Sequence, residues 1–161
     1  FVRQVTGLPK FNAKSKCMIA LAFITPRVDS PMESKTRIAT TKYGLPPAVT
    51  NYTVPGATFS NGAPITLDLA WPEFRVAIEY DGDHHRTDKN QWRRDNDKRE
   101  LLRHHHWIVI IATAANMADE PSQAELAYRV GRQLALRGAV FDFTLTATPL
   151  DELARRRRRR I

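Results

Sequence analysis

The sequence predicts an α/β (α+β) fold, one mixed four-stranded sheet flanked by helices, with the element order α-β-β-β-α-β-α. Residues 65–71 ("ITLDLAW") alternate apolar and polar side chains, which is typical of a strand with one buried face. Residues 107–113 ("WIVIIAT") form a near-continuous apolar run, as expected of a strand covered on both faces. Polar segments with helix-capping residues lie between such runs, so strands and helices belong to one domain.

The first helix of this domain is expected to begin after Ser30. Ser30 is a typical N-cap, Pro31 occupies the first helical position, and Glu33 lies three residues after the cap, which is the capping-box pattern. Gly44 is expected to end the helix, because glycine accepts the left-handed conformation that follows many helix ends. Glu33 is therefore interpreted first as a capping residue.

The remaining elements follow in order. Residues 48–54 ("AVTNYTV") are rich in β-branched side chains and predict a strand, and residues 55–64 predict a turn region with an Asn-Gly pair. After residues 65–71, a turn at "PEF" leads into a returning strand over 75–81. A polar helix with Thr87 as its cap is expected before the apolar run, and a final helix over 122–138 after it.

We expect three regions along the chain. Because the sequence begins with Phe1, residues 1–28 are interpreted as the remnant of an upstream helical region, and residues 29–138 as the α/β domain. Residues 139–161 are expected to be a disordered tail. Its Arg155–Arg160 run supplies most of the net charge of +8, since the other residues hold 19 Lys and Arg against 17 Asp and Glu. Such a run either binds nucleic acid or acidic surfaces, or is a solvated end.

Composition excludes a protein that spans a membrane by an apolar helix and one that is stabilised by internal disulfides. No apolar run approaches the roughly 20 residues that span a membrane. The single cysteine cannot form an internal disulfide and fits a reducing compartment. We therefore expect a cytoplasmic protein that does not bind membranes.

The hairpin formed by residues 65–81 predicts a cluster of carboxylates. If the chain turns at "PEF", Asp68 lies opposite Glu79, and Asp81 lies on the same face because residues i and i+2 of a strand share a face. Like charges at such short range are unfavourable unless they share a proton or bind a cation. Carboxylate oxygens suit Mg²⁺ or Mn²⁺. A register shifted by one residue would instead leave solvated surface acids.

Five motifs over residues 30–137 together resemble the PD-(D/E)xK endonuclease superfamily. The similarity is greatest to its very-short-patch-repair-like (Vsr-like) branch of small bacterial, often actinobacterial, proteins. The motifs are the helix glutamate Glu33, "LDLAW" with Asp68, "AIEYDGDHH" with Glu79, "RRDNDKRELL", and the apolar strand "WIVIIATA". The resemblance implies a restriction-endonuclease-like core and a metal-dependent enzyme that hydrolyses phosphodiester bonds in DNA.

The resemblance also implies roles for individual residues. Asp68 and Glu79 would be the ligands of Mg²⁺ or Mn²⁺, and Glu33 would complete the site. Asp81 stands where the superfamily usually has a lysine, which leaves the water-activating role open. His85 matches the family's histidine and would act as an acid or base, since its pKa lies near neutrality.

The helix expected over residues 87–106 is basic on one face and would bind the phosphates of DNA. The residues expected to do so are Lys89, Arg93, Arg94, Lys98, Arg99 and Arg103. Acidic residues are interleaved with them, so a simple solvated face is the alternative. The resemblance matches Asp95 and Lys98 to a polar pair, and Lys89 and Lys98 are possible substitutes for the missing lysine. His104–His106 are interpreted as a helix C-terminus, where histidine favours the dipole, or as a second metal site.

A second function from another class stays open at this point. The chain would then have a nuclease-like fold that only binds nucleic acid, or would be the effector end of a regulator or toxin–antitoxin protein. A weaker third interpretation, an HNH-type nuclease suggested by "DHH", lacks a well-spaced histidine on the following helix before His104.

Overall fold

The computed structural model describes residue 7 and residues 12–82 and 89–158. The chain divides into two compact units. One unit is Arg27–Ala147, and the other combines residues up to Pro26 with residues from Thr148 onward. No helix within the described ranges is long and apolar enough to cross a membrane. The α/β unit therefore starts close to the expected residue 29 but ends at Ala147, nine residues beyond the expected 138.

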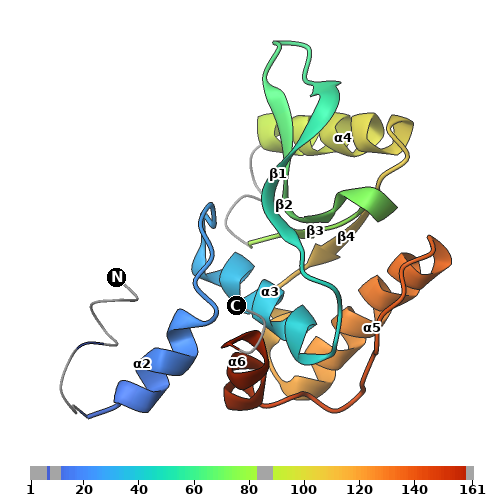
Figure 1. The fold of residues 1–161 in the computed structure, drawn as a ribbon. Helices are drawn as coiled ribbons and strands as arrows, with labels where there is room; N and C mark the ends of the chain where they lie inside the picture. The colour runs from blue at the N-terminus through green and yellow to red at the C-terminus, as the bar shows by residue number, and fades with distance from the viewer. Residues whose placement is uncertain (1–6, 8–11, 83–88, 159–161) are drawn as a thin grey trace. The chain divides into compact units, whose positions relative to one another are not determined.

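A mixed four-stranded sheet forms the centre of the larger unit (Figure 1). Its strands are β1 (Val49–Thr58), β2 (Pro64–Trp71), β3 (Val76–Tyr80) and β4 (Ile108–Ala112), in the order β1-β2-β3-β4. The β1–β2 and β2–β3 pairs are antiparallel, whereas β3 and β4 are parallel. This arrangement confirms the predicted α/β class.

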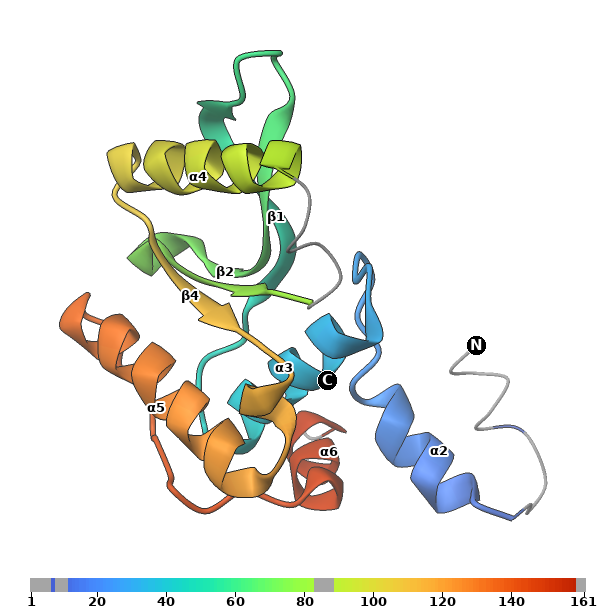
Figure 2. The ribbon, with the colours of Figure 1, turned by 180° about the vertical axis from the view of Figure 1, so that it is seen from behind.

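Helices cover both faces of the sheet. Helix α4 (Lys89–His104) packs on one face, and α3 (Pro31–Lys42) and α5 (Glu120–Leu136) lie on the other (Figure 2). The strand residues alternate accordingly. Leu69 and Ile78 belong to the cluster with α3 and α5, while Ala70 and Ala77 belong to the cluster with Leu102 of α4. Residues that share a face with Ala70 and Ala77 are therefore directed towards α4.

The turn between β2 and β3 sets the register that positions the candidate site. A short 3₁₀ helix, η1 (Pro72–Phe74), makes the turn, and Arg75 follows it with a φ of 50°. The register pairs Trp71 with Val76 and Leu69 with Ile78, as the sequence predicted.

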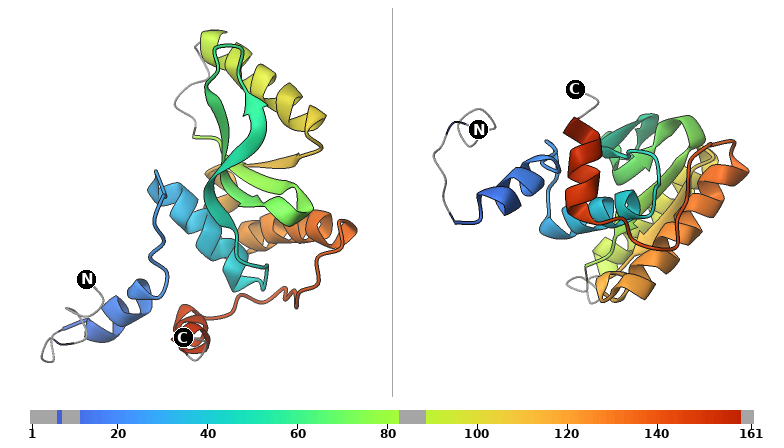
Figure 3. Two further views of the ribbon diagram at one scale, coloured as in Figure 1. Left: turned by 45° about the horizontal axis from the view of Figure 1, so that its top comes forward. Right: turned by 60° about the horizontal axis from the view of Figure 1, so that its bottom comes forward.

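The first strand is longer than predicted. β1 continues to Thr58 with an irregular register between Thr53 and Thr58, because Gly56 takes a φ of 74° and lets the chain pass the Pro55-Gly56 dipeptide without ending the strand. The outer part of the β1–β2 hairpin runs alongside α4 (Figure 3).

The helix starts follow from their caps. The Ser30 hydroxyl accepts a 3.1 Å hydrogen bond from the Glu33 backbone N–H, and Pro31 is the first residue of α3, as predicted. Helix α5 begins at Glu120, two residues before the predicted residue 122. Its cap is Asp119, whose carboxylate accepts a 2.8 Å hydrogen bond from the Ser122 backbone N–H. The dipeptide before Ser122 thus forms the first turn rather than a loop.

The expectation of a disordered tail from residue 139 is wrong for the described residues. Phe141 and Phe143 pack against the core cluster of α3 and α5, and the Thr144 backbone N–H donates a 3.1 Å hydrogen bond to the Tyr43 carbonyl. Two aromatic side chains bury enough apolar surface to fix a segment that lacks regular secondary structure.

The smaller unit contains α2 (Lys14–Leu21) and α6 (Leu150–Arg158). The Arg157 guanidinium donates a 2.8 Å hydrogen bond to the Ala22 carbonyl and lies 5.2 Å from the centre of the Phe23 ring. Within α6, Asp151 pairs with Arg155, and Glu152 pairs with Arg156. Arg155–Arg158 therefore belong to a helix, in which acidic residues one turn earlier offset part of their charge, and the last two arginines of the run lie outside the described residues. The origin of residues 1–28 in a larger helical region remains a prediction.

Candidate functional site

Asp68 and Glu79 form the centre of the candidate site. The β2–β3 register ends with Leu69 opposite Ile78, and Asp68 and Glu79 are the next residue on each strand, close enough that the charge of Asp68 acts on Glu79. The Asp68 Oδ2 atom accepts a 2.8 Å hydrogen bond from the Tyr80 backbone N–H. The two carboxylates are therefore held together by the hairpin that the sequence predicted.

Both carboxyl groups are disfavoured as anions. Burial is the largest cause that raises the pKa of Asp68 above its ordinary 3.8; the Tyr80 N–H opposes this rise, and the charge of Glu33 adds to it. Burial also raises the pKa of Glu79 above 4.5, although the ammonium of Lys98 opposes it and the charge of Asp68 adds to it. A pair of half-buried, like-charged groups of this kind is a strong attractor for a cation.

Lys98 supplies a cation at this position. It reaches from α4 to Glu79, where its Nζ atom pairs with the Oε1 atom. Only 21% of the Lys98 side chain and 18% of the Glu79 side chain are exposed. Lys98 was expected among the residues that bind DNA, and also as a substitute for the missing lysine of the motif. Its contact with Glu79 places a positive charge beside the carboxylate pair, and both expectations remain predictions.

Glu33 is buried, with 8% exposure, and serves as a capping residue. Its Oε2 atom accepts a 3.0 Å hydrogen bond from the Asp29 backbone N–H, one residue before the N-cap. The Asp29 carboxylate in turn accepts a 2.7 Å hydrogen bond from the Asn51 side chain. The effect of Glu33 on the candidate site is electrostatic, because its negative charge adds to the rise in the pKa of Asp68. No periodic pattern marks Asp29 or Asn51, which come from a loop and from the edge strand.

Asp81 lies beside Glu79 but in a different setting. It is exposed, and its backbone N–H donates a 2.8 Å hydrogen bond to the Ala112 carbonyl. Asp81 lines a cavity of about 180 Å³ together with Glu79, Asp95 and Arg99.

The predicted patch of three carboxylates is not found where the structure describes the chain. No three His, Cys, Asp or Glu side chains in those ranges are grouped so that they could hold a metal ion. The physical reason is that β3 ends at Tyr80, so the strand geometry that would align Asp81 with Asp68 and Glu79 stops one residue too early. Asp68 and Glu79 remain as a pair.

The other predicted residues divide into two groups. His85 and the side chain of Lys89 lie outside the described part of the molecule, although Lys89 is the first residue of α4. Arg93, Arg94 and Arg99 are exposed on α4, as is Arg103. Exposed acids, Asp97 and Glu100, are interleaved with them, so the helix presents a mixed rather than a purely basic face.

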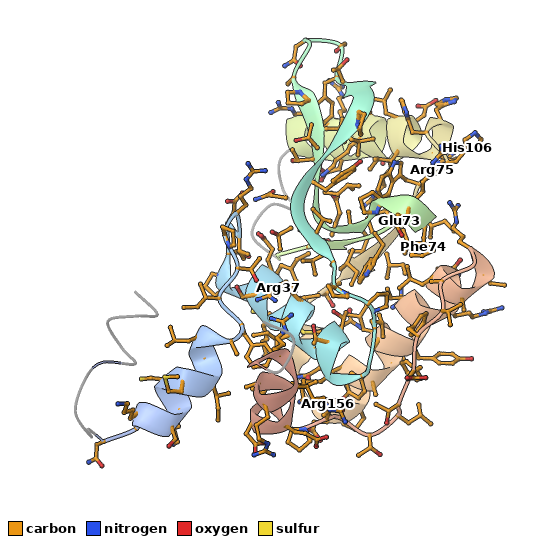
Figure 4. The ribbon with its side chains drawn as sticks, in the orientation of Figure 1. Arg37, Glu73, Phe74, Arg75, His106 and Arg156 are labelled. Atoms are coloured by element: carbon orange, nitrogen blue, oxygen red, sulfur yellow. The ribbon has the colours of Figure 1, made fainter. Side chains whose placement is uncertain are left out.

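The three histidines form the end of α4. The His106 backbone N–H donates to the Arg103 carbonyl at 2.9 Å, and the Trp107 N–H donates to the Leu102 carbonyl at 2.9 Å. This pair of bonds is a Schellman motif, and His106 takes the left-handed position with a φ of 60° (Figure 4). The helix-terminus interpretation therefore accounts for His106.

Known proteins similar to this chain are themselves described only as uncharacterised. "Uncharacterized protein Rv2248" and "Uncharacterized protein MT2308", from two strains of Mycobacterium tuberculosis, are each 29% identical over 114 residues. The match covers 71% of this chain, and the chain spans about 40% of the length of these relatives. No family model and no solved structure matches the chain.

Proposed function

We propose that this chain is a metal-dependent DNA endonuclease that hydrolyses phosphodiester bonds, related to the PD-(D/E)xK superfamily. The observation that carries the proposal is the Asp68–Glu79 pair, two half-buried carboxylates on the adjacent strands β2 and β3, near enough that the charge of Asp68 acts on Glu79. Two like charges on adjacent strands destabilise a sheet unless a bound cation or a shared proton offsets their repulsion. In this proposal a hard divalent cation offsets it.

The donor set suits Mg²⁺ or Mn²⁺. Magnesium is typically held in proteins by one or two carboxylates and keeps several of its waters. Asp68 and Glu79 provide the two carboxylates. The cavity of about 180 Å³ beside Glu79 equals the volume of roughly six water molecules. A bound divalent cation would polarise a phosphate oxygen and lower the pKa of a water molecule.

The chain's own residues would bind and orient the DNA. Arg93, Arg94 and Arg99 are exposed on α4, the helix that also carries Lys98, and would hold backbone phosphates next to the carboxylate pair. Phosphate contacts carry no sequence information, so they predict binding without a preferred sequence. His85 would serve as an acid or base. A DNA partner and the single cysteine are both consistent with a location in the cytoplasm.

The test is cleavage of supercoiled plasmid DNA with Mg²⁺ or Mn²⁺, compared with EDTA. Asp68→Asn and Glu79→Gln should each lower the rate at least about a hundredfold, because each removes a ligand while keeping the side-chain shape. Glu73→Gln is the matched control, because Glu73 is an exposed carboxylate on η1 of the same hairpin (Figure 4). Full activity in both ligand variants would refute the assignment.

A second candidate is a protein that binds nucleic acid without cleaving it, as part of a regulator or toxin–antitoxin system. Two observations favour it: Lys98 already neutralises Glu79, and the described residues contain no group of three metal-binding side chains. This candidate predicts a gel shift with DNA that persists in EDTA, with no cleavage in Mg²⁺ or Mn²⁺. The two candidates are separated by these assays alone.

A further inference from the structure

We propose that Lys98 is an exchangeable counter-ion, which neutralises Glu79 in the metal-free protein and must withdraw when a divalent cation binds. The inference rests on the proposed function, because it concerns the same carboxylate pair. It adds that metal binding and the position of Lys98 are coupled, so Lys98 weakens metal binding and, once released, is a positioning residue for the phosphate.

The first step is the charge balance around Glu79. The charges of Asp68 and Asp95 both act on it, so Glu79 sits among acidic groups with 18% of its side chain exposed. A carboxylate in such a place requires a cation. In the structure the Lys98 ammonium fills that requirement through Oε1.

The second step is the conflict between two cations. A divalent ion held by Asp68 and Glu79 would lie within a few ångströms of an ammonium on the same carboxylate. Two positive charges at that range repel strongly in a half-buried site. The ammonium therefore has to leave Glu79, or the metal binds weakly.

The third step is where the ammonium would go. Lys98 is a flexible four-carbon side chain on α4, and Glu79, which it contacts, lines the cavity together with Arg99. A short rotation of the stem would carry the ammonium from Glu79 towards that cavity, where the phosphate of a bound DNA strand would lie next to the metal. The withdrawal would thus place a positive charge where the substrate brings a negative one.

A purely structural ion pair would behave differently. If Lys98 only joined α4 to β3, its removal would lower stability and leave the metal site unchanged or distorted. The exchange instead predicts that removal of the charge tightens metal binding. The affinity for the metal, measured without DNA, therefore separates the two roles.

The experiment measures Mn²⁺ binding to the full chain by calorimetry in the absence of DNA. Lys98→Met should lower the dissociation constant roughly tenfold or more, because it removes a competing unit charge. Lys98→Arg, which keeps the charge, should stay within a few-fold of wild type. Arg129→Met is the matched control, because it removes an exposed charge from α5, on the opposite face of the sheet, and should change the constant less than about twofold.

The same variants are then assayed for plasmid cleavage at saturating Mn²⁺. Lys98→Met should cleave more slowly although it binds the metal more tightly. If Lys98→Met fails to fold, as judged by thermal unfolding in EDTA, Lys98→Gln replaces it, since the amide still donates a hydrogen bond to Glu79 without a charge.

The outcomes distinguish this inference from the proposed function. Unchanged or weaker Mn²⁺ binding in folded Lys98→Met or Lys98→Gln, together with wild-type cleavage that needs Asp68, would overturn the exchange alone. Tighter binding in Lys98→Met with no cleavage by any variant would support the exchange and refute the nuclease. Absence of Mn²⁺ binding by wild type and by Lys98→Met at millimolar metal would overturn both.

Discussion

The carboxylate of Asp68 on β2 accepts a hydrogen bond of 2.8 Å from the backbone N–H of Tyr80 on β3. This bond fixes one oxygen of a half-buried acid and joins the two strands that carry the candidate metal ligands. It does not compensate fully for burial, because the pKa of Asp68 is still raised above 3.8. The ionised Asp68 carboxylate therefore lowers the free energy of unfolding of the metal-free protein.

Asp68→Asn should therefore stabilise the metal-free protein at neutral pH. A raised pKa means that the folded protein binds the Asp68 proton more tightly than the unfolded chain does. The wild-type free energy of unfolding then decreases as the pH rises from about 3.8 through the raised pKa. Asparagine keeps an acceptor for the Tyr80 N–H and never ionises. We expect a gain on the order of 1 kcal/mol at pH 7, vanishing below pH 3.8.

Urea unfolding in EDTA at several pH values measures this difference. Glu73→Gln is the control, because Glu73 is exposed on η1 and should show no comparable gain. A variant Asp68→Asn that is no more stable than wild type at pH 7 would contradict the argument that burial outweighs the Tyr80 hydrogen bond.

Gly44 and Gly138 allow the effects of backbone conformation and steric contact to be separated. Both follow a helix with a left-handed φ, 86° and 91°. A β-carbon on Gly44 would lie 2.0 Å from the Asp142 carbonyl oxygen, whereas one on Gly138 would have open space. Gly138→Ala should therefore cost about 1 kcal/mol, and Gly44→Ala about 3 kcal/mol or more.

Chemical denaturation of the two alanine variants checks this prediction. Equal losses would mean that residues 139–147 can move away from Gly44 without penalty. A larger loss for Gly44→Ala would show that the segment expected to be disordered is held in place by its packing on α3.

Features that depend on residues close together in the sequence could be predicted, whereas features that depend on contacts between distant segments could not. The β2–β3 register follows from the short turn at Pro72–Phe74, which fixes the Asp68–Glu79 pair within 12 residues of chain. The contact of Lys98 with Glu79 spans 19 residues and depends on how α4 crosses the sheet. The pattern of apolar residues in the sequence does not predict how α4 packs across the sheet.

Segment 139–147 was mispredicted for a related reason. It has no period of a helix or strand, and Phe141 and Phe143 are ordered only because α3 and α5 provide a surface for them. Asp29 and Asn51 were missed because each is an ordinary polar residue by sequence; the charge of Asp29 acts on Asp68, and a 2.7 Å hydrogen bond joins Asn51 to Asp29. Tertiary contacts of this kind override local preference.

His106→Gly should stabilise the protein. His106 has a φ of 60° at the end of α4, a conformation that glycine adopts without steric cost. We expect a gain of about 0.5–1 kcal/mol after allowance for the greater freedom of glycine in the unfolded chain. His104→Gly is the matched control, because His104 is the last helical residue and is exposed. It should lose stability, by up to about 1 kcal/mol.

Thermal unfolding of both histidine variants measures the two effects, which should have opposite signs. A loss of stability in His106→Gly would show that the imidazole makes contacts worth more than the strain of its backbone. Cleavage activity should not change, since His106 lies at the far end of α4 from its first residue, Lys89.

Arg94→Gln should weaken DNA binding in a way that depends on salt. Arg94 is exposed on α4, the helix whose Lys98 contacts Glu79. If Arg94 contacts a phosphate, its removal should reduce the slope of log affinity against log salt by about 0.9. Arg129→Gln removes the same charge from an exposed position on α5, on the opposite face of the sheet, and should leave the slope unchanged. Fluorescence anisotropy with a short duplex in EDTA, between 50 and 200 mM salt as a typical range, measures both slopes. Equal decreases for the two variants would indicate a general effect of net charge and would remove α4 as the DNA-binding face.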